Sequence, residues 1–296
     1  MDRFEAEHAR IVAQDQALGG AQRVENDAVE LAMRIKSALS RGVAASMWVR
    51  TKLYCLASDV TCSAAFAAID AQARTRARGH LDAAVTYAGL SGNSETQYHV
   101  WNHLSIVAGQ RNDHAEVSAA ADAAKSQSIA KKDLLYASLA HLRNARAHAG
   151  RQDRSAALRA LRAAEGSFDR HASVQRPRWI EFFDGAELDG LTSIVWLRLG
   201  EPDRAEYHLH RALGAIQPER VRNRTYYIAH LSLSQARQGD FESACHTADQ
   251  AAELLGCVRG SKRTTDTLAS VRKLVVSSGT KEPSVLDWAE RAQAWI

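Results

Sequence analysis

Proline and aromatic residues are scarce in this sequence. Its 296 residues include four prolines against 54 alanines, and Phe, Trp and Tyr together make up 6%. β-Branched residues nowhere form alternating runs bounded by Asn-Gly or Asp-Gly turns, so an all-β fold has no support. Because alanine is the best helix former and hydrophobic residues reach 46%, the composition predicts an all-α fold with a buried core.

Long apolar runs and paired cysteines are also lacking. No stretch of eighteen apolar residues occurs, and the opening MDRFE lacks the basic and apolar segments of a signal peptide. Cys55, Cys62, Cys245 and Cys257 have no CxxC spacing and are too few for a disulfide scaffold. We therefore expect a cytoplasmic protein with reduced thiols and no membrane partner.

No sign of charge dominates the chain, which has 38 basic and 34 acidic residues and a net charge of +4. The densest basic stretch contains Arg74, Arg76 and Arg78, whose spacing cannot place all three on one helix face. This pattern favours a solvated helix over a stripe that follows a phosphate backbone.

Motifs of known catalytic sites are missing. The sequence has no GxSxG, HExxH, GxxxxGK[ST] or CxxC, and no GxGxxG after a strand. Asp184 and Glu187 could act as an acid and a base, but no nucleophile accompanies them, so helix-surface acids are the favoured interpretation. We assign no catalytic residue and no cofactor.

Helical hairpins recur along the sequence. Each begins with a large residue and a leucine three positions later, continues through a turn and ends in a helix with repeated small residues, a pattern typical of tetratricopeptide repeats. The predicted turns are separated by 41, 38, 50 and 39 residues, against about 34 in an ideal repeat. They are centred on Ala71, Asn112, Gly150, Gly200 and Gly239.

These repeats predict a tetratricopeptide-like α-solenoid of about five hairpins. Small side chains in the second helix of a hairpin let the first helix approach closely, and each hairpin then buries its apolar stripe on the next. We expect a single domain over 1–296. It comprises an N-terminal helical cap over 1–41, repeats over 42–256 and C-terminal capping helices over 257–296.

The longest interval between turns holds a predicted loop over 167–177, after which a helix is expected to begin near Trp179. Trp179, Phe182 and Phe183 cluster at this junction. They could cover one end of a groove, or bury the linker against the solenoid, and the sequence leaves both alternatives open. Trp101 and Trp196 fall at positions that normally pack inside a repeat.

The first helix of each hairpin should line the concave face of the solenoid. Counting back from each turn, the second, fifth, sixth and ninth positions should face the groove. The polar residues at these positions form the predicted ligand-binding set: His99, Asn102, His103, His141, Asn144, Glu187, Tyr226 and His230. His103, His141 and His230 share the sixth position and could form a row that binds an anion or senses pH, although twelve histidines also align by chance.

A metal site is a narrower hypothesis for the same helix. Glu95, His99 and His103 follow at i, i+4 and i+8, but three such positions span about 12 Å, too far for one ion. The pair His99 and His103 could chelate an ion with Cys62 or His141 from a neighbouring hairpin. Hydrogen-bonded groove histidines are the favoured interpretation, and we expect no metal.

Several stretches carry a family resemblance. These are IVAQDQALGG at 11–20, GHLDAAVTYAGLSGN at 79–93, RWIEFFDGAELDGL at 178–191, LGEPDRA at 199–205 and RVRNR at 220–224. Over roughly 10–260, and most strongly over 176–256, the sequence resembles the tetratricopeptide-like C-terminal sensor region of actinobacterial helix-turn-helix regulators of the Xre type. Members of that family carry a DNA-binding domain ahead of this region, whereas some ten residues precede it here. We therefore expect no sequence-specific DNA binding by this chain alone.

Repeat pattern and resemblance together indicate a regulatory binding module. Its concave groove would bind a small molecule or peptide and signal to a protein partner in transcriptional or secondary-metabolism regulation. A secondary-metabolism enzyme that uses the groove as its pocket is the alternative, and a protein scaffold is a third. A groove that grips a peptide carboxylate is disfavoured, because Asn102 and Asn144 have no basic companions. The sequence leaves a homodimer open.

Overall fold

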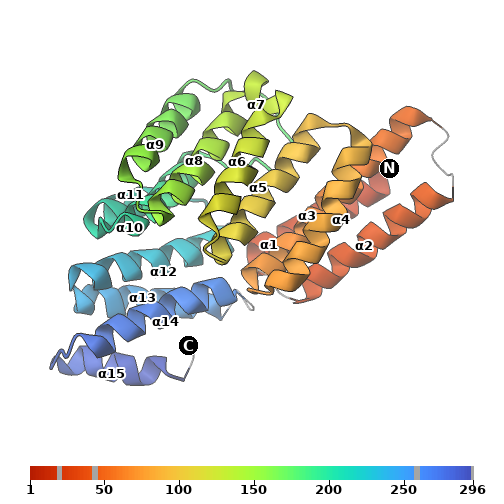
Figure 1. Ribbon diagram of the computed structural model, residues 1–296. Coiled ribbons are helices and arrows are strands. Elements are labelled where there is room, and N and C mark those ends of the chain that lie inside the picture. The colour runs from red at the N-terminus through yellow and green to blue at the C-terminus, as the bar shows by residue number, and fades with distance from the viewer. Residues whose placement is uncertain (19–21, 42–45, 257–260, 295–296) are drawn as a thin grey trace. The chain divides into compact units, whose positions relative to one another are not determined.

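The computed structural model is all-α, as predicted, and describes residues 1–18, 22–41, 46–256 and 261–294 (Figure 1). These residues form fifteen helices and no strand. The helices are α1 (Asp2–Leu18), α2 (Gln22–Ser40), α3 (Met47–Asp70), α4 (Arg74–Ser91), α5 (Ser94–Gln110), α6 (His114–Ser126), α7 (Ser128–Lys132), α8 (Leu134–Gly150), α9 (Arg154–Asp169), α10 (Gly185–Arg198), α11 (Pro202–Ala215), α12 (Val221–Gln238), α13 (Phe241–Leu255), α14 (Lys262–Ser277) and α15 (Pro283–Ala292).

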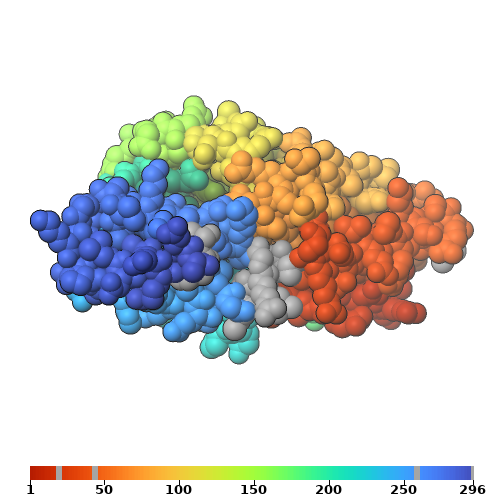
Figure 2. Space-filling model, turned by 90° about the horizontal axis from the view of Figure 1, so that it is seen from below, coloured from red at the N-terminus to blue at the C-terminus, as the bar shows by residue number. Residues whose placement is uncertain are grey.

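The chain divides into two compact units. The first contains residues 1–15 and 20–182, and the second contains residues 16–19 and 183–296. In the first unit α3 pairs with α4, α5 with α6, and α8 with α9, while α2 packs on α3. Figure 2 shows the N-terminal helices in red against α3 and α4 in orange. In the second unit α10 pairs with α11, α12 with α13, and α14 with α15.

Turn chemistry explains where the hairpins reverse. Asn112, Gln152 and Gly239 adopt positive φ angles of 56°, 60° and 85°, within two residues of predicted turns. An aspartate follows each of them and caps the next helix, with its carboxylate accepting a hydrogen bond from a backbone N–H of the first turn. The capping residues are Asp113, Asp153 and Asp240.

Small side chains pack the second helices against the first, as the repeat pattern predicts. Ala244, Ala248 and Ala251 on α13 are fully buried, and α4 and α9 bury alanines in the same way. Gly190 on α10 has a similar role, because a Cβ added there would lie 2.2 Å from Cζ of Tyr227 on α12. Close helix contact therefore depends on the absence of bulk at these positions.

Three features differ from the sequence prediction, the first being that α9 continues to Asp169, inside the loop predicted over 167–177. The helix expected near Trp179 begins only at Gly185, because residues 178–182 form turns and the Asp184 carboxylate caps α10 by accepting from the Glu187 N–H. In addition, the short helix α7 lies between α6 and α8, where the sequence predicted none. Residues 170–184, between α9 and α10, form a long connection without a helix.

One helix, α3, is long and apolar enough to cross a bilayer by length and composition. Most of this helix is buried inside the structure. Burial of this kind is what a core helix shows, so packing accounts for its apolar character. Cys55, Cys62 and Cys245 are free thiols, and Cys257 lies outside the described residues.

Candidate functional site

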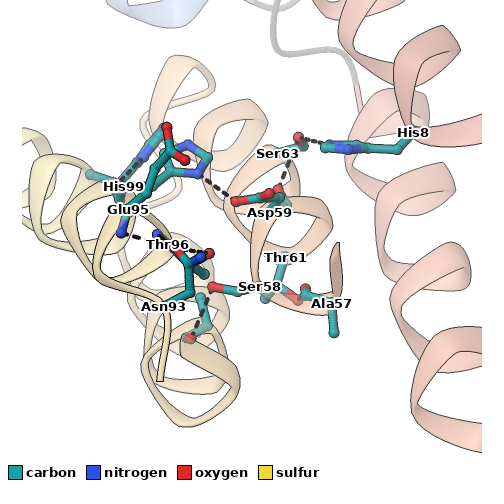
Figure 3. A network of polar contacts seen from close by, with 12 residues as sticks. His8, Ala57, Ser58, Asp59, Thr61, Ser63, Asn93, Glu95, Thr96 and His99 are labelled. Atoms are coloured by element: carbon teal, nitrogen blue, oxygen red, sulfur yellow. Dashed lines mark hydrogen bonds and ion pairs between the residues drawn. The ribbon is translucent and has the colours of Figure 1, made fainter. Parts of the chain in front are cut away.

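Three buried side chains and one half-buried carboxylate meet where α3 and α5 pack together in the first unit. Asp59 and Cys62 are three residues apart on α3, and His99 and His103 are four apart on α5. Each spacing places its pair on one helix face, and the two helices are in contact. We call Asp59, Cys62, His99 and His103 the histidine cluster. Figure 3 shows Asp59 on α3 directed at the His99 ring on α5.

His99 is held by Asp59. Its Nδ1 lies 2.9 Å from the Asp59 carboxylate, and the residue is 4% exposed. Burial disfavours charge on both partners, so it lowers the pKa of His99 to about 3 and raises the pKa of Asp59 to about 7. His99 is therefore a neutral imidazole at neutral pH, and its Nδ1 is hydrogen-bonded to the Asp59 carboxyl group.

A third histidine approaches the cluster from α1. His8 Nε2 lies 2.9 Å from the Ser63 hydroxyl, which donates to the Asp59 carbonyl oxygen at 3.3 Å (Figure 3). Burial lowers the pKa of His8, and the Asp59 carboxylate opposes that shift. The N-terminal helix is thus connected through Ser63 to the backbone of the residue that holds His99.

Cys62 and His103 complete the cluster. His103 Nδ1 lies 3.1 Å from the His99 carbonyl oxygen, and the two imidazole rings are 4.7 Å apart. Cys62 is fully buried, and burial raises the pKa of its thiol well above the usual value. One potential ligand atom from each of Cys62, His99 and His103 lies within 4.8 Å of the other two. Thiolate and imidazole ligands of this kind bind zinc and similar transition-metal ions.

Trp179 covers His99. Its indole stacks on the imidazole with ring centroids 4.1 Å apart and planes inclined by 11°. Tyr98 and Tyr136 lie against the same indole, with centroids 5.9 Å and 5.7 Å away. Trp179 itself is only half-buried, so the linker after α9 contributes an aromatic surface to this part of the first unit.

The linker that carries Trp179 is tied to α8. Arg176 donates to both carboxylate oxygens of Asp133, at 2.7 Å and 3.0 Å, and to the Ala172 carbonyl oxygen at 2.7 Å. Ile180 is fully buried one residue beyond Trp179. The sequence left open whether the junction aromatics bury the linker or cover a groove. In the structure Trp179 packs on the helices and is also partly accessible.

A carboxylate borders this aromatic group. The Tyr136 hydroxyl donates to Glu95, and the Tyr98 hydroxyl donates to the Tyr136 carbonyl oxygen at 2.6 Å. Burial raises the pKa of Glu95, and the hydrogen bond from Tyr136 opposes the increase. Glu95, Tyr136, Trp179 and the histidine cluster thus place hydrogen-bonding groups and aromatic faces close together.

The other predicted residues of the first unit have different partners. Asn102 is buried and accepts from Arg143 Nε at 2.9 Å. Asn144 is also buried, donates to Asp122 on α6 at 2.9 Å and accepts from the Ser118 hydroxyl at 3.1 Å. His141 is half-exposed, and burial lowers its pKa, as does the nearby Lys125.

Glu187, Tyr226 and His230 belong to the second unit. Glu187 accepts from the Asn223 side chain at 3.0 Å. The Tyr226 ring lies 4.2 Å from the His230 ring and carries the Arg263 guanidinium 4.2 Å above its face. The row formed by His103, His141 and His230 stays a prediction, because its members come from both units.

The spacing of residues in the sequence predicts only some of the residues of this site. Helical periodicity predicts the pair His99 and His103, and the hairpin order predicts Cys62 or His141 beside it. Asp59, His8 and the stack of Trp179 on His99 carry no comparable signal, because each depends on contacts across 40 or more residues. The one local signal is that Asp59 precedes Cys62, a candidate metal ligand, by three positions.

No protein-family model matches the chain, and no curated protein matches it significantly.

Proposed function

We propose that this protein is a regulatory binding module on a tetratricopeptide-like α-solenoid. Its hairpin order supports the solenoid, because the first helices of successive hairpins contact one another: α3 with α5 and α5 with α8 in the first unit, and α10 with α12 in the second. Such contacts bring first-helix side chains onto a shared face, where solenoids bind their ligands.

A single observation carries the assignment of a binding role: the half-buried Trp179 stacks on a buried, hydrogen-bonded histidine. Indole, phenol and imidazole rings offer flat apolar surfaces, and Glu95 and Tyr136 add a fixed acceptor and donor beside them. Small ligand sites combine these elements, a mostly apolar lining with a few oriented polar groups. We infer a small, partly aromatic molecule or a peptide side chain as the ligand.

The proposed regulatory role rests on the position of Trp179 in the chain. The linker that carries Trp179 joins the two units, so a ligand that moves Trp179 acts on the segment between them. We propose that a cytoplasmic protein partner responds to this change, in transcriptional or secondary-metabolism regulation, and that the chain alone does not read DNA sequence.

The test is a thermal-shift screen of a metabolite library on the full chain, followed by calorimetric titration of each hit. We expect Trp179→Ala to weaken binding at least tenfold, and Trp48→Ala, whose indole is 68% exposed on α3, to bind like the wild type. Equal affinity in both variants would refute the site. Hits recovered chemically unchanged support a binding module, and hits converted to product support the alternative of an enzyme.

A further inference from the structure

We propose that Cys62, His99 and His103 bind a transition-metal ion of the zinc class. One ligand atom from each lies within 4.8 Å of the others, and all three residues are buried. Ligands of a tetrahedral zinc ion lie about 3.3 to 3.8 Å from one another, given bond lengths near 2.0 to 2.3 Å. A shift of about 1 Å in side-chain position would therefore bring the three groups into coordination distance.

Hydrogen bonds at Nδ1 favour, in both imidazoles, the tautomer that leaves Nε2 available to a metal ion. His99 uses Nδ1–H toward the Asp59 carboxylate at 2.9 Å, and His103 uses Nδ1–H toward the His99 carbonyl oxygen at 3.1 Å. Each ring then has its lone pair on Nε2. A carboxylate or carbonyl behind the ligating histidine is the usual outer contact of protein zinc sites, where it orients the ring and raises its basicity.

The surroundings favour an ion that prefers sulfur and nitrogen. Cys62 belongs to an apolar cluster with Ala65, Val100 and Leu104, and the Phe66 ring packs edge-on against His103 at 5.5 Å. Such a site excludes bulk water. Mg²⁺ and Ca²⁺ are disfavoured because they require several oxygen ligands, whereas these three side chains offer sulfur and nitrogen. Binding would release the Cys62 proton to solvent and leave a fourth coordination position for a water or an outside ligand.

This inference does not rest on the proposed organic ligand. Metal binding depends on Cys62 and the two imidazoles, whereas the ligand site depends on the accessible surface of Trp179. The variants Cys62→Ser and Trp179→Ala therefore separate the two proposals, since each should affect one kind of binding and largely spare the other.

The probe is Co²⁺, titrated into the full chain after dialysis against a chelator. We expect one equivalent to give a thiolate-to-cobalt charge-transfer band in the near ultraviolet and tetrahedral bands in the visible, both removed by one equivalent of Zn²⁺. Cys62→Ser should abolish the charge-transfer band, and His103→Gln should weaken Co²⁺ affinity at least a hundredfold. Asp59→Asn should weaken it about 10- to 100-fold.

Cys245→Ser is the matched control, because Cys245 is also a buried free thiol but lies on α13 in the second unit. It should bind Co²⁺ like the wild type. Circular dichroism of each variant checks folding, and His103→Gln decides the outcome if Cys62→Ser fails to fold. A wild-type spectrum without a thiolate band, or a band that survives both Cys62→Ser and His103→Gln, would overturn the proposal.

Discussion

Gly190 shows how one missing methyl group positions two helices. The Tyr227 ring occupies the space that a Cβ would take, with its Cζ 2.2 Å away. Tyr227 is buried and cannot move into solvent. We expect Gly190→Ala to destabilise the protein by about 1 to 3 kcal/mol, as overpacking of a core does, in thermal melting.

Gly214 on α11 provides the matched control in the same unit. A Cβ there meets nothing within 4 Å, and the position is helical. Gly214→Ala should therefore stabilise by roughly 0.5 to 1 kcal/mol through the higher helix propensity of alanine. Equal melting temperatures for the two variants would show that the Tyr227 ring does not occupy the space beside Gly190.

Asp133 is a residue at which stability should depend on pH. Burial opposes its ionisation, but Arg176, the hydrogen bond from the Leu135 N–H and the charge of His171 together outweigh burial and lower the pKa of Asp133. A depressed folded-state pKa gives stability that is present above the unfolded value, near 4, and is lost as pH falls through the folded value. The tether of the Trp179 linker should therefore weaken in acid.

Asp133→Asn isolates this effect, because the amide oxygen can still cap α8 while the charge is removed. We expect the variant to be less stable than the wild type by about 1 kcal/mol at pH 7 and equal to it near pH 2. Urea denaturation at the two pH values measures the difference. A gap that persists unchanged in acid would show that the ion pair is not its source.

At the scale of elements, the aspartate caps at the turns should each support one helix. Asp240 accepts from the Ser243 N–H at 3.1 Å and begins α13 directly after the left-handed Gly239. Asp240→Ala should cost about 1 kcal/mol in thermal melting, whereas Asp240→Asn should cost less because it keeps the oxygen acceptor. Equal losses in both variants would point to charge rather than capping.

Most helices could be predicted from the sequence, because their signals are local. Periodic apolar residues, Asn112, Gly200 and Gly239 at the turns and aspartate caps all act within a few residues. The start of α10 could not be predicted as well, since Trp179 and Pro177 suggested a helix where the chain instead makes turns that place the indole on His99. Long-range packing determines that segment, and spacing alone does not report it.

The same distinction applies to the candidate site. Helical spacing put His99 and His103 on one face and left Cys62 and His141 as alternative neighbours, of which the structure brings Cys62 close. Spacing could not show that six of the eight predicted groove residues are buried, among them Asn102 and Asn144, because burial depends on the neighbouring helices and the linker. Variants at these buried positions should therefore change stability as well as binding.

At the scale of the whole molecule, a net charge of +4 gives little attraction to a polyanion. We expect the chain to bind duplex DNA weakly, without sequence preference, and with affinity that falls steeply as salt rises. Electrophoretic mobility shifts with random and defined duplexes across a salt series measure this. A sequence-specific, salt-resistant shift would contradict the proposal that the chain alone does not read DNA.

Native mass spectrometry of the purified full chain shows whether the Trp179-covered site of the first unit binds a ligand. We expect an added mass larger than that of a metal ion in the wild type and in Trp48→Ala, and loss of this organic mass in Trp179→Ala. The same spectra distinguish a monomer from a dimer. Samples that all lack such an organic mass, or an organic mass that survives in Trp179→Ala, would contradict ligand binding at Trp179.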